Sequence, residues 1–284
     1  MHGSGHREFN LLSLNLELYL DQSVLISSLD GWSKIEEIGE GSFGVVSLYS
    51  APFRDSPMVV GEKFKVRLWN LNEGEKEDLK RHVSKFNEKV NTQAKASRAC
   101  HQHIGQLIGC YWGSTKLILF TEYMENGSIK GQIVDSPLPE VTALKYLFQA
   151  TQGVHFLPHF SEGRIIHRDI KCANLLLTRN WDVKLADFGL VYQLAVDKNS
   201  NNIAVCSMQV RQSLGCTLVE MLTGYPPHVD FWKKRKGLAP FFPGQQEEAD
   251  SWEKLQHTGH QLVPNASELV QRLLDCTFIK NEAN

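Results

Sequence analysis

The chain changes character about halfway along, from short β-rich segments to long helical ones. The β-rich segments, which flank one polar helical stretch at 72–98, are Val45–Leu48, Met58–Val60 and Leu117–Phe120. The helical segments are 141–154, with apolar residues at helical spacing, and Leu214–Leu222, which Gly224 and Pro226 end. Because strands and helices segregate instead of alternating, the sequence predicts an α+β fold with two lobes.

Length and charge limit the kinds of partner. The chain has 284 residues, 42% of them hydrophobic, which is enough to build the core of one two-lobed domain. Its 30 basic and 32 acidic side chains leave a formal net charge of −2, so we expect neither nucleic acid nor a membrane as a partner.

None of the six cysteines forms a CxxC pair, which argues against a zinc site and a disulfide framework.

The first residues give no sign of export. No apolar run is long enough to span a bilayer. Glu17 and Asp21 interrupt the first apolar segment, so we expect no signal peptide and a cytoplasmic protein.

Leucines alternate with other residues near the N-terminus, at positions 12, 14, 16, 18 and 20. A period of two predicts a strand with all five leucines on one face. Two interpretations stay open: an extra strand packed on the domain, or an extended docking segment for a partner.

A glycine-rich segment, Gly39-Glu40-Gly41-Ser42-Phe43-Gly44, precedes one of the predicted strands. In a dinucleotide-binding fold such a segment leads into a helix, whereas here Val45 and Val46 continue as β-type sequence. This context favours a hairpin whose backbone amides approach a triphosphate, although the glycines alone also fit a simple turn. Lys63 follows Gly44 by 19 residues and could supply an ammonium to the α- and β-phosphates.

The most specific pattern is His167-Arg168-Asp169-Ile170-Lys171-Cys172-Ala173-Asn174, followed 13 residues later by Asp187-Phe188-Gly189. Five fixed residues at roughly one in twenty each make a chance match negligible. With these motifs the sequence resembles the eukaryotic protein kinases, from about Trp32 to Phe278.

The resemblance implies a role for each motif residue, with ATP and Mg²⁺ as cosubstrate and metal. Asp169 would accept the proton of the substrate hydroxyl, and Lys171 would steady the transferring phosphoryl group. Asn174 and Asp187 would hold Mg²⁺. Lysine at position 171 is similar to the serine/threonine branch, so the implied acceptors are serine and threonine of proteins.

The segment Leu119–Ser128 resembles the kinase hinge, with Thr121 as gatekeeper. The residues that would bind ATP are Ile38, Gly39, Gly41, Gly44, Val46, Lys63, Glu122, Met124 and Leu176. Gly61 stands where the family has an alanine two residues before the lysine. Glu88 would be the ion-pair partner of Lys63, the alternative being an ordinary solvated glutamate.

Within the family, the segment Ser213–Pro227 and the HRDIKxAN pattern resemble the upstream kinases of mitogen-activated cascades, the STE group. That resemblance implies signal transduction, with a downstream MAP kinase kinase among the protein substrates.

One region departs from the family pattern. Only 26 positions separate Asp187 from Ser213, about twenty too few for the activation segment and its Ala-Pro-Glu motif. Val210 stands where the family has an aspartate that braces the catalytic loop. The resemblance therefore implies a shortened C-lobe and a reduced surface for docking a polypeptide.

The expected organisation is an N-terminal extension, 1–32, and a kinase domain, 33–280, made of an N-lobe at about 33–121, a hinge at 122–127 and a C-lobe at 128–280. The expected function is transfer of the γ-phosphoryl of ATP to serine or threonine. The alternative is a pseudokinase, a nucleotide-binding scaffold with weak or no transfer. The intact motif residues favour the enzyme, and the missing docking segment favours the scaffold.

Overall fold

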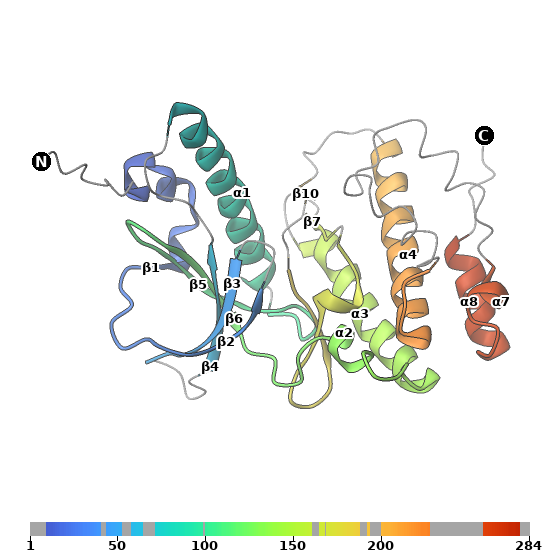
Figure 1. Ribbon diagram of the computed structural model, residues 1–284. Helices are drawn as coiled ribbons and strands as arrows, with labels where there is room; N and C mark the ends of the chain where they lie inside the picture. Colours follow the sequence, from blue (N-terminus) through green and yellow to red (C-terminus); the bar gives the residue numbers. More distant parts are fainter. Residues whose placement is uncertain are drawn as a thin grey trace, which may run out of the picture.

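A computed structural model describes residues 10–40, 44–52, 58–64, 72–98, 100–160, 165–167, 169–187, 192–193, 200–227 and 258–278. Figure 1 shows a β-sheet with one long helix at one end of the molecule and a group of helices at the other. This arrangement confirms the predicted two-lobed α+β fold.

The first lobe is built on a six-stranded sheet of order β1-β5-β6-β4-β3-β2. Its strands are β1 (Leu25–Ile26), β2 (Ser33–Glu40), β3 (Gly44–Ser50), β4 (Met58–Phe64), β5 (Leu107–Trp112) and β6 (Leu117–Glu122). Neighbouring strands are antiparallel except β1 and β5, which are parallel. The three predicted β-rich segments are confirmed as β3, β4 and β6.

Helix α1 (Glu73–Arg98) covers one face of this sheet, as the predicted polar helix at 72–98. Its buried stripe of Leu79, Val83, Phe86, Val90 and Ala94 packs in one cluster with Leu117 and Leu119 of β6. The opposite face carries Tyr49, Val59 and Phe120, and the Trp32 ring lies tilted by 35° against the Phe120 ring, with 4.2 Å between ring centroids. The two faces of β4 and β6 therefore have different surroundings.

The leucine-rich N-terminal segment is not the predicted strand. It forms three 3₁₀ turns, η1 (Leu11–Leu14), η2 (Leu16–Tyr19) and η3 (Gln22–Val24), before the short strand β1. Asn15 takes a left-handed conformation with φ of 51°, which breaks an extended chain between η1 and η2. Leu11 and Leu20 are buried against α1, whereas Leu18 is exposed. The segment thus packs on the domain, but as turns.

Side chains of α1 fasten this segment in place. The Nδ2 of Asn91 donates to the carbonyl of Tyr19 at 2.7 Å, and the N–H of Asp21 donates to Oδ1 of Asn91 at 2.8 Å. Arg98 pairs with the carboxylate of Asp21.

The second lobe is mainly helical. Its elements are α2 (Ile129–Gln132), α3 (Glu140–Phe160), β7 (Ile165–Ile166), η4 (Cys172–Asn174), β8 (Leu175–Leu177), β9 (Val183–Leu185), β10 (Tyr192–Gln193), α4 (Ser200–Thr223), α7 (Gly259–Leu262) and α8 (Glu268–Phe278). Ala143, Tyr146 and Ala150 of α3 join Leu218 of α4 and Leu274 of α8 in one buried cluster. The two predicted helices are therefore confirmed as α3 and α4.

Helix α4 starts at Ser200, earlier than the apolar pattern predicts, and ends where predicted. Gly224 follows it with φ of +80°, and its N–H donates to the carbonyl of Glu220 at 2.8 Å. Gly215 lets α8 approach, since a Cβ there would lie 2.8 Å from Oγ1 of Thr277. Within the described part of the chain, no helix combines the length and apolar character needed to cross a bilayer.

Backbone hydrogen bonds join the two lobes directly. The N–H of Gly105 donates to Leu185 O at 2.8 Å, and the N–H of Leu185 donates to His103 O at 2.9 Å. Since β9 ends just before Asp187, these bonds fix the candidate metal-binding residue against the base of the first lobe.

Candidate active site

The loop between β7 and η4 holds the carboxylate of Asp169 from two sides. Lys171 Nζ contacts its Oδ2 at 2.7 Å, and Asn174 Nδ2 donates to the same oxygen at 2.8 Å. Asn174 also donates to the backbone carbonyl of Asp169 at 2.8 Å. The three predicted catalytic-loop residues thus meet at one carboxylate, which is partly accessible to solvent.

His167 anchors this loop from below. Its ring is buried, and Nε2 donates to the carbonyl of Ala186 at 2.9 Å, because a carbonyl oxygen can only accept. Nδ1 then accepts from the N–H of Asp169 at 3.4 Å. Burial lowers the pKa of His167 below its usual value, against the smaller opposing effect of the Ala186 carbonyl. The imidazole is therefore a neutral structural link between Asp169 and the segment before Asp187.

Asp187 follows β9 in a left-handed conformation, with φ of 55°. The N–H of Ala186 donates to the carbonyl of Asn174 at 2.9 Å, which brings the two predicted metal ligands together. Both hydrogen bonds that Asn174 donates from Nδ2 go to Asp169. Oδ1 is therefore the Asn174 atom that would bind a metal. A carboxylate and an amide oxygen are the hard donors that Mg²⁺ takes together with substrate phosphates. The donor set therefore fits this ion.

Strand β4 presents Glu62, not Lys63, to helix α1. Glu62 lies directly opposite Leu119, which packs against α1, while Lys63 lies opposite Ile118 in the cluster on the other face. Side chains alternate between the faces of a strand, so Lys63 points away from α1 and is exposed.

Helix α1 likewise presents Lys89 instead of Glu88. Lys89 is 4% exposed, and its Nζ lies 2.8 Å from Oε2 of Glu62 and 3.2 Å from Oδ1 of Asp187. Glu88 is on the exposed side of the helix. Among the described residues the predicted pair of Lys63 with Glu88 does not form, and Glu62 with Lys89 stands in its place. Sequence reasoning missed both.

The residues predicted to surround adenine lie around the junction of the lobes. Thr121 is opposite Val60 on the inner face of the sheet, Val46 and Leu176 are half-buried, and Ile38 is more exposed. Met124 is buried in the linking segment. Gly39 and Gly44 flank the predicted phosphate loop, and Gly41 lies outside the described residues.

Gly61, which the resemblance aligns with the family's alanine, does not share the face of β4 on which Val60 and Glu62 lie. It lies opposite Phe120, and a Cβ there would come within 2.6 Å of the Tyr49 ring. Val60 therefore holds the place, two residues before Glu62, that the prediction gave to Gly61. The side chain of Glu122 is also engaged, with Lys184 Nζ at 2.8 Å.

Thr217 of α4 contacts the catalytic loop, seven residues after Val210, which stands where the family has a bracing aspartate. Its hydroxyl donates to Ser213 O at 2.7 Å, and the same Oγ1 lies 3.4 Å from Ile170 O. Cys172 donates from its Sγ to the carbonyl of Thr217 at 3.6 Å, and burial raises the pKa of that thiol. Val210 is half-buried seven residues earlier on the helix. Ten residues of the shortened segment, 188–191 and 194–199, lie outside the described residues, and its shortening stays a prediction.

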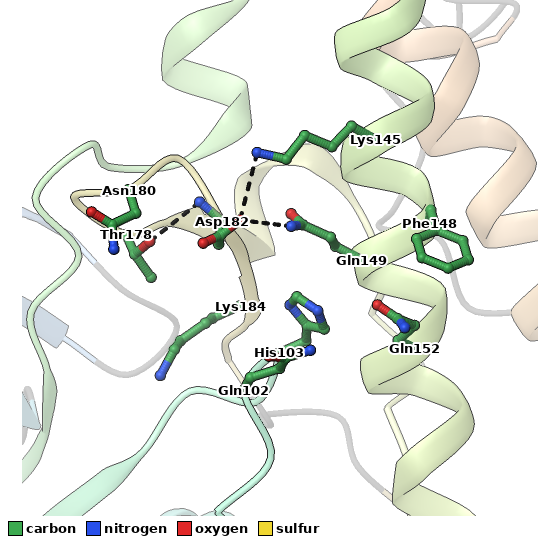
Figure 2. Close-up of a pocket in the computed structure, with 10 residues that line it drawn as sticks. All are labelled: Gln102, His103, Lys145, Phe148, Gln149, Gln152, Thr178, Asn180, Asp182 and Lys184. Carbon is green, nitrogen blue, oxygen red and sulfur yellow. Dashed lines mark hydrogen bonds and ion pairs between the residues drawn. The ribbon is translucent and has the colours of Figure 1, made fainter.

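A surface cavity of about 410 Å³ lies between α3, the β8–β9 turn and the residues before β5. Figure 2 shows the residues that line it. It is lined by Gln102, His103, Lys145, Phe148, Gln149, Gln152, Thr178, Asn180, Asp182 and Lys184. None of the predicted catalytic or ATP-binding residues is among them, so this cavity is separate from the candidate active site.

Comparison with known proteins agrees with this geometry. The protein kinase domain family matches residues 32–210 of the chain. Serine/threonine-protein kinase flr-4 of Caenorhabditis elegans is 29% identical over 94% of this chain and 51% of that protein. Mitogen-activated protein kinase kinase kinase 1a of Physcomitrium patens is 33% identical over 77% of this chain and 30% of that protein.

A third relative, MAP3K epsilon protein kinase 1 of Arabidopsis thaliana, is 30% identical over 69% of this chain and 14% of that protein. The chain thus spans about half of the C. elegans relative and less than a third of the other two. The chain belongs to the protein kinase domain family, and it resembles serine/threonine kinases that include MAP3K-type members.

Proposed function

We propose that the protein transfers the γ-phosphoryl group of ATP to serine or threonine residues of other proteins. The observation that carries this proposal is the Asp169 carboxylate, held at 2.7 Å by Lys171 and at 2.8 Å by Asn174. An oriented carboxylate beside an ammonium is what a hydroxyl acceptor and a negatively charged phosphoryl group require.

Each residue has a defined part in this proposal. Asp169 orients the acceptor hydroxyl and takes up its proton, while Lys171 balances charge on the transferring group. Asn174 and Asp187 would bind Mg²⁺, which neutralises charge on the phosphate oxygens when it is bound. His167 keeps Asp169 in position through the hydrogen bond from the Asp169 N–H. The hinge around Thr121 and Met124 would hold the adenine.

The names of two relatives support a place in a signalling cascade. Both the P. patens and the A. thaliana proteins are named as MAP kinase kinase kinases. We therefore propose a MAP kinase kinase among the substrates and a cytoplasmic location. Incubation of the protein with ATP and a purified, catalytically inactive MAP kinase kinase should give phosphoserine or phosphothreonine on that acceptor.

The activity itself is tested with radiolabelled ATP and Mg²⁺, using a basic protein and the chain itself as acceptors. Asp169→Asn keeps the size of the side chain but removes the base, so transfer should fall by about 10²–10⁴-fold. The matched control is Asp135→Asn, an exposed aspartate outside the site, which should transfer as the unmodified chain does. Label on tyrosine only, or equal transfer by Asp169→Asn, would refute the proposal.

A second candidate function, a nucleotide-binding scaffold with little transfer, is favoured by Val210. Valine offers no hydrogen-bond acceptor in its side chain, so it cannot brace the catalytic loop as an aspartate would. A scaffold would bind Mg²⁺-ATP but incorporate no label above the Asp169→Asn variant.

A further inference from the structure

The position predicted for a Lys63–Glu88 pair holds an ion pair with its charges exchanged between strand and helix. Glu62 comes from β4 and Lys89 from α1, and their charged atoms lie 2.8 Å apart. We propose that Lys89 is the ammonium that binds the phosphates of ATP, and that Glu62 is the carboxylate that holds it in place. This assignment rests on the proposed function, since it requires that the chain bind a nucleotide.

The register of β4 argues against Lys63 in this role. For Lys63 to face α1, the strand would have to slip by one residue, which would turn every side chain to the other face. Glu62 would then take the place, opposite Phe120, that Gly61 now holds. A Cβ at Gly61 would already lie 2.6 Å from the Tyr49 ring and 2.9 Å from the Phe120 ring. Packing on the face of the sheet that carries Tyr49 and Phe120 thus fixes Glu62 as the residue of β4 that faces α1.

The rotation of α1 is fixed equally firmly. Phe86, Val90 and Ala94 are all buried in the cluster against the sheet. Lys89 lies three residues after Phe86 and so falls close to the same face, while Glu88 falls two residues from both Phe86 and Val90, on the far side. Turning Glu88 inward would expose this apolar stripe.

The exchanged pair keeps the charges that a phosphate site needs. A lysine that is 4% exposed must be compensated, and two carboxylates do so, Glu62 at 2.8 Å and Asp187 at 3.2 Å. One ammonium and two carboxylates is also the set that Lys63, Glu88 and Asp187 would have supplied. Only the element that carries the cation differs.

The contact with Asp187 locates the ammonium relative to the substrate. Asp187 is the proposed metal ligand, so phosphate oxygens would lie beside it. A phosphate oxygen there would be an acceptor for Lys89, while Glu62 keeps the ammonium oriented from behind. Helix α1, not strand β4, would then carry the ammonium that binds the phosphates.

The test compares the binding of Mg²⁺-ATP with that of adenosine, which has the same base but no phosphate. Lys89→Met should weaken ATP binding by roughly 10- to 100-fold, as expected for a lost charge-assisted hydrogen bond, and leave adenosine binding unchanged. Lys63→Met should keep ATP affinity within about twofold, as for an exposed side chain. The matched control is Lys85→Met, an exposed lysine on α1, which should change neither affinity.

Two double variants guard against simple misfolding. Glu62→Gln with Lys89→Met removes both partners of the 2.8 Å pair, so Glu62 is not left buried without its cation, and should bind adenosine but not ATP. Glu62→Lys with Lys89→Glu returns the ammonium to the strand and should recover ATP binding relative to Lys89→Met.

The outcomes separate this assignment from the proposed function. Loss of ATP binding in Lys63→Met, with binding kept in Lys89→Met, would overturn the assignment alone. An unmodified chain that binds neither ATP nor adenosine would overturn the proposed function and the assignment with it.

Discussion

Lys184 of β9 and Glu122 of β6 form an ion pair across the junction of the two lobes, with Nζ 2.8 Å and 2.9 Å from the two carboxylate oxygens. The same carboxylate accepts the backbone N–H of Gln106 at 2.7 Å. One carboxylate therefore ties together the end of the sheet, the segment before β5 and the strand that leads to Asp187.

Loss of this pair should destabilise the protein. Lys184→Met leaves Glu122 partly buried without its cation, so we expect the free energy of unfolding to fall by about 1–3 kcal/mol. Lys145→Met is the control, since that lysine pairs with Asp182 at 3.5 Å on the surface and should cost less than about 1 kcal/mol. Urea unfolding measures both, and equal losses would contradict the proposed link between the lobes.

The N-terminal turns should contribute to the stability of the first lobe. Leu11 is fully buried against α1, so Leu11→Ala should cost about 2–5 kcal/mol. Leu18 is 73% exposed in the same segment, and Leu18→Ala should be nearly neutral. Thermal unfolding of the two variants distinguishes a packed segment from a free one, in which both changes would be silent.

Gly61 tests the register of β4. Gly61→Ala places a methyl group against Tyr49 and Phe120, so we expect a loss of about 1–3 kcal/mol from overpacking. Gly131→Ala in α2 meets only Ser128 Oγ, at 3.8 Å, and should be neutral or slightly stabilising. A Gly61→Ala variant as stable as the unmodified chain would mean that Gly61 does not face Tyr49 and Phe120, and would contradict this register of β4.

His167 should make the stability depend on pH. Burial keeps the pKa of His167 below the unfolded value of about 6.5. Just below that pH, His167 therefore binds a proton in the unfolded chain but not in the folded chain. Stability should therefore be complete above pH 6.5 and fall on acidification, by up to about 1.4 kcal/mol per pH unit for this group. His101, whose pKa burial also lowers, adds in the same direction.

The measurement is the urea midpoint at pH 7.5 and at pH 5.5. His167→Gln cannot titrate and should show a smaller difference between the two. His82→Gln, an exposed histidine on α1, should keep the full difference. Identical pH dependence in His167→Gln would mean that the imidazole is not the group responsible.

The catalytic loop could be predicted from sequence because its residues lie close together along the chain. Asp169, Lys171 and Asn174 fall within six positions, and local backbone geometry is enough to bring them into contact. Asp187 follows a short hairpin, β8 and β9, that returns the chain to the same place.

The lysine that would bind the ATP phosphates could not be placed in the same way. The pairs Glu62-Lys63 and Glu88-Lys89 each have an acidic and a basic residue at adjacent positions. A one-residue error in the alignment then places a strand side chain on the opposite face of the sheet, and a helix side chain on a different side of the helix. Helical periodicity from Phe86 and Val90 did carry the signal for Lys89. The outer-face packing that fixes Glu62 depends on Tyr49 and Phe120, which only the folded sheet brings together.

The leucine alternation misled for a related reason. Its period of two fits a strand, but Asn10 caps a 3₁₀ turn through the N–H of Leu12, and Asn15 adopts a left-handed conformation. Local side-chain hydrogen bonds and packing against α1 outweigh the pattern.

The central claim, that this chain is a catalytically competent kinase built on Asp169, is tested most directly by a single-turnover transfer rate at saturating Mg²⁺-ATP. Measured beside Asp169→Asn on one peptide substrate, the unmodified chain should transfer phosphate well above that variant. The predicted shortening of the activation segment should nonetheless keep the rate below the roughly 10 s⁻¹ that is ordinary for enzymes. A chain that binds ATP but transfers no faster than Asp169→Asn would contradict the claim and leave a nucleotide-binding scaffold.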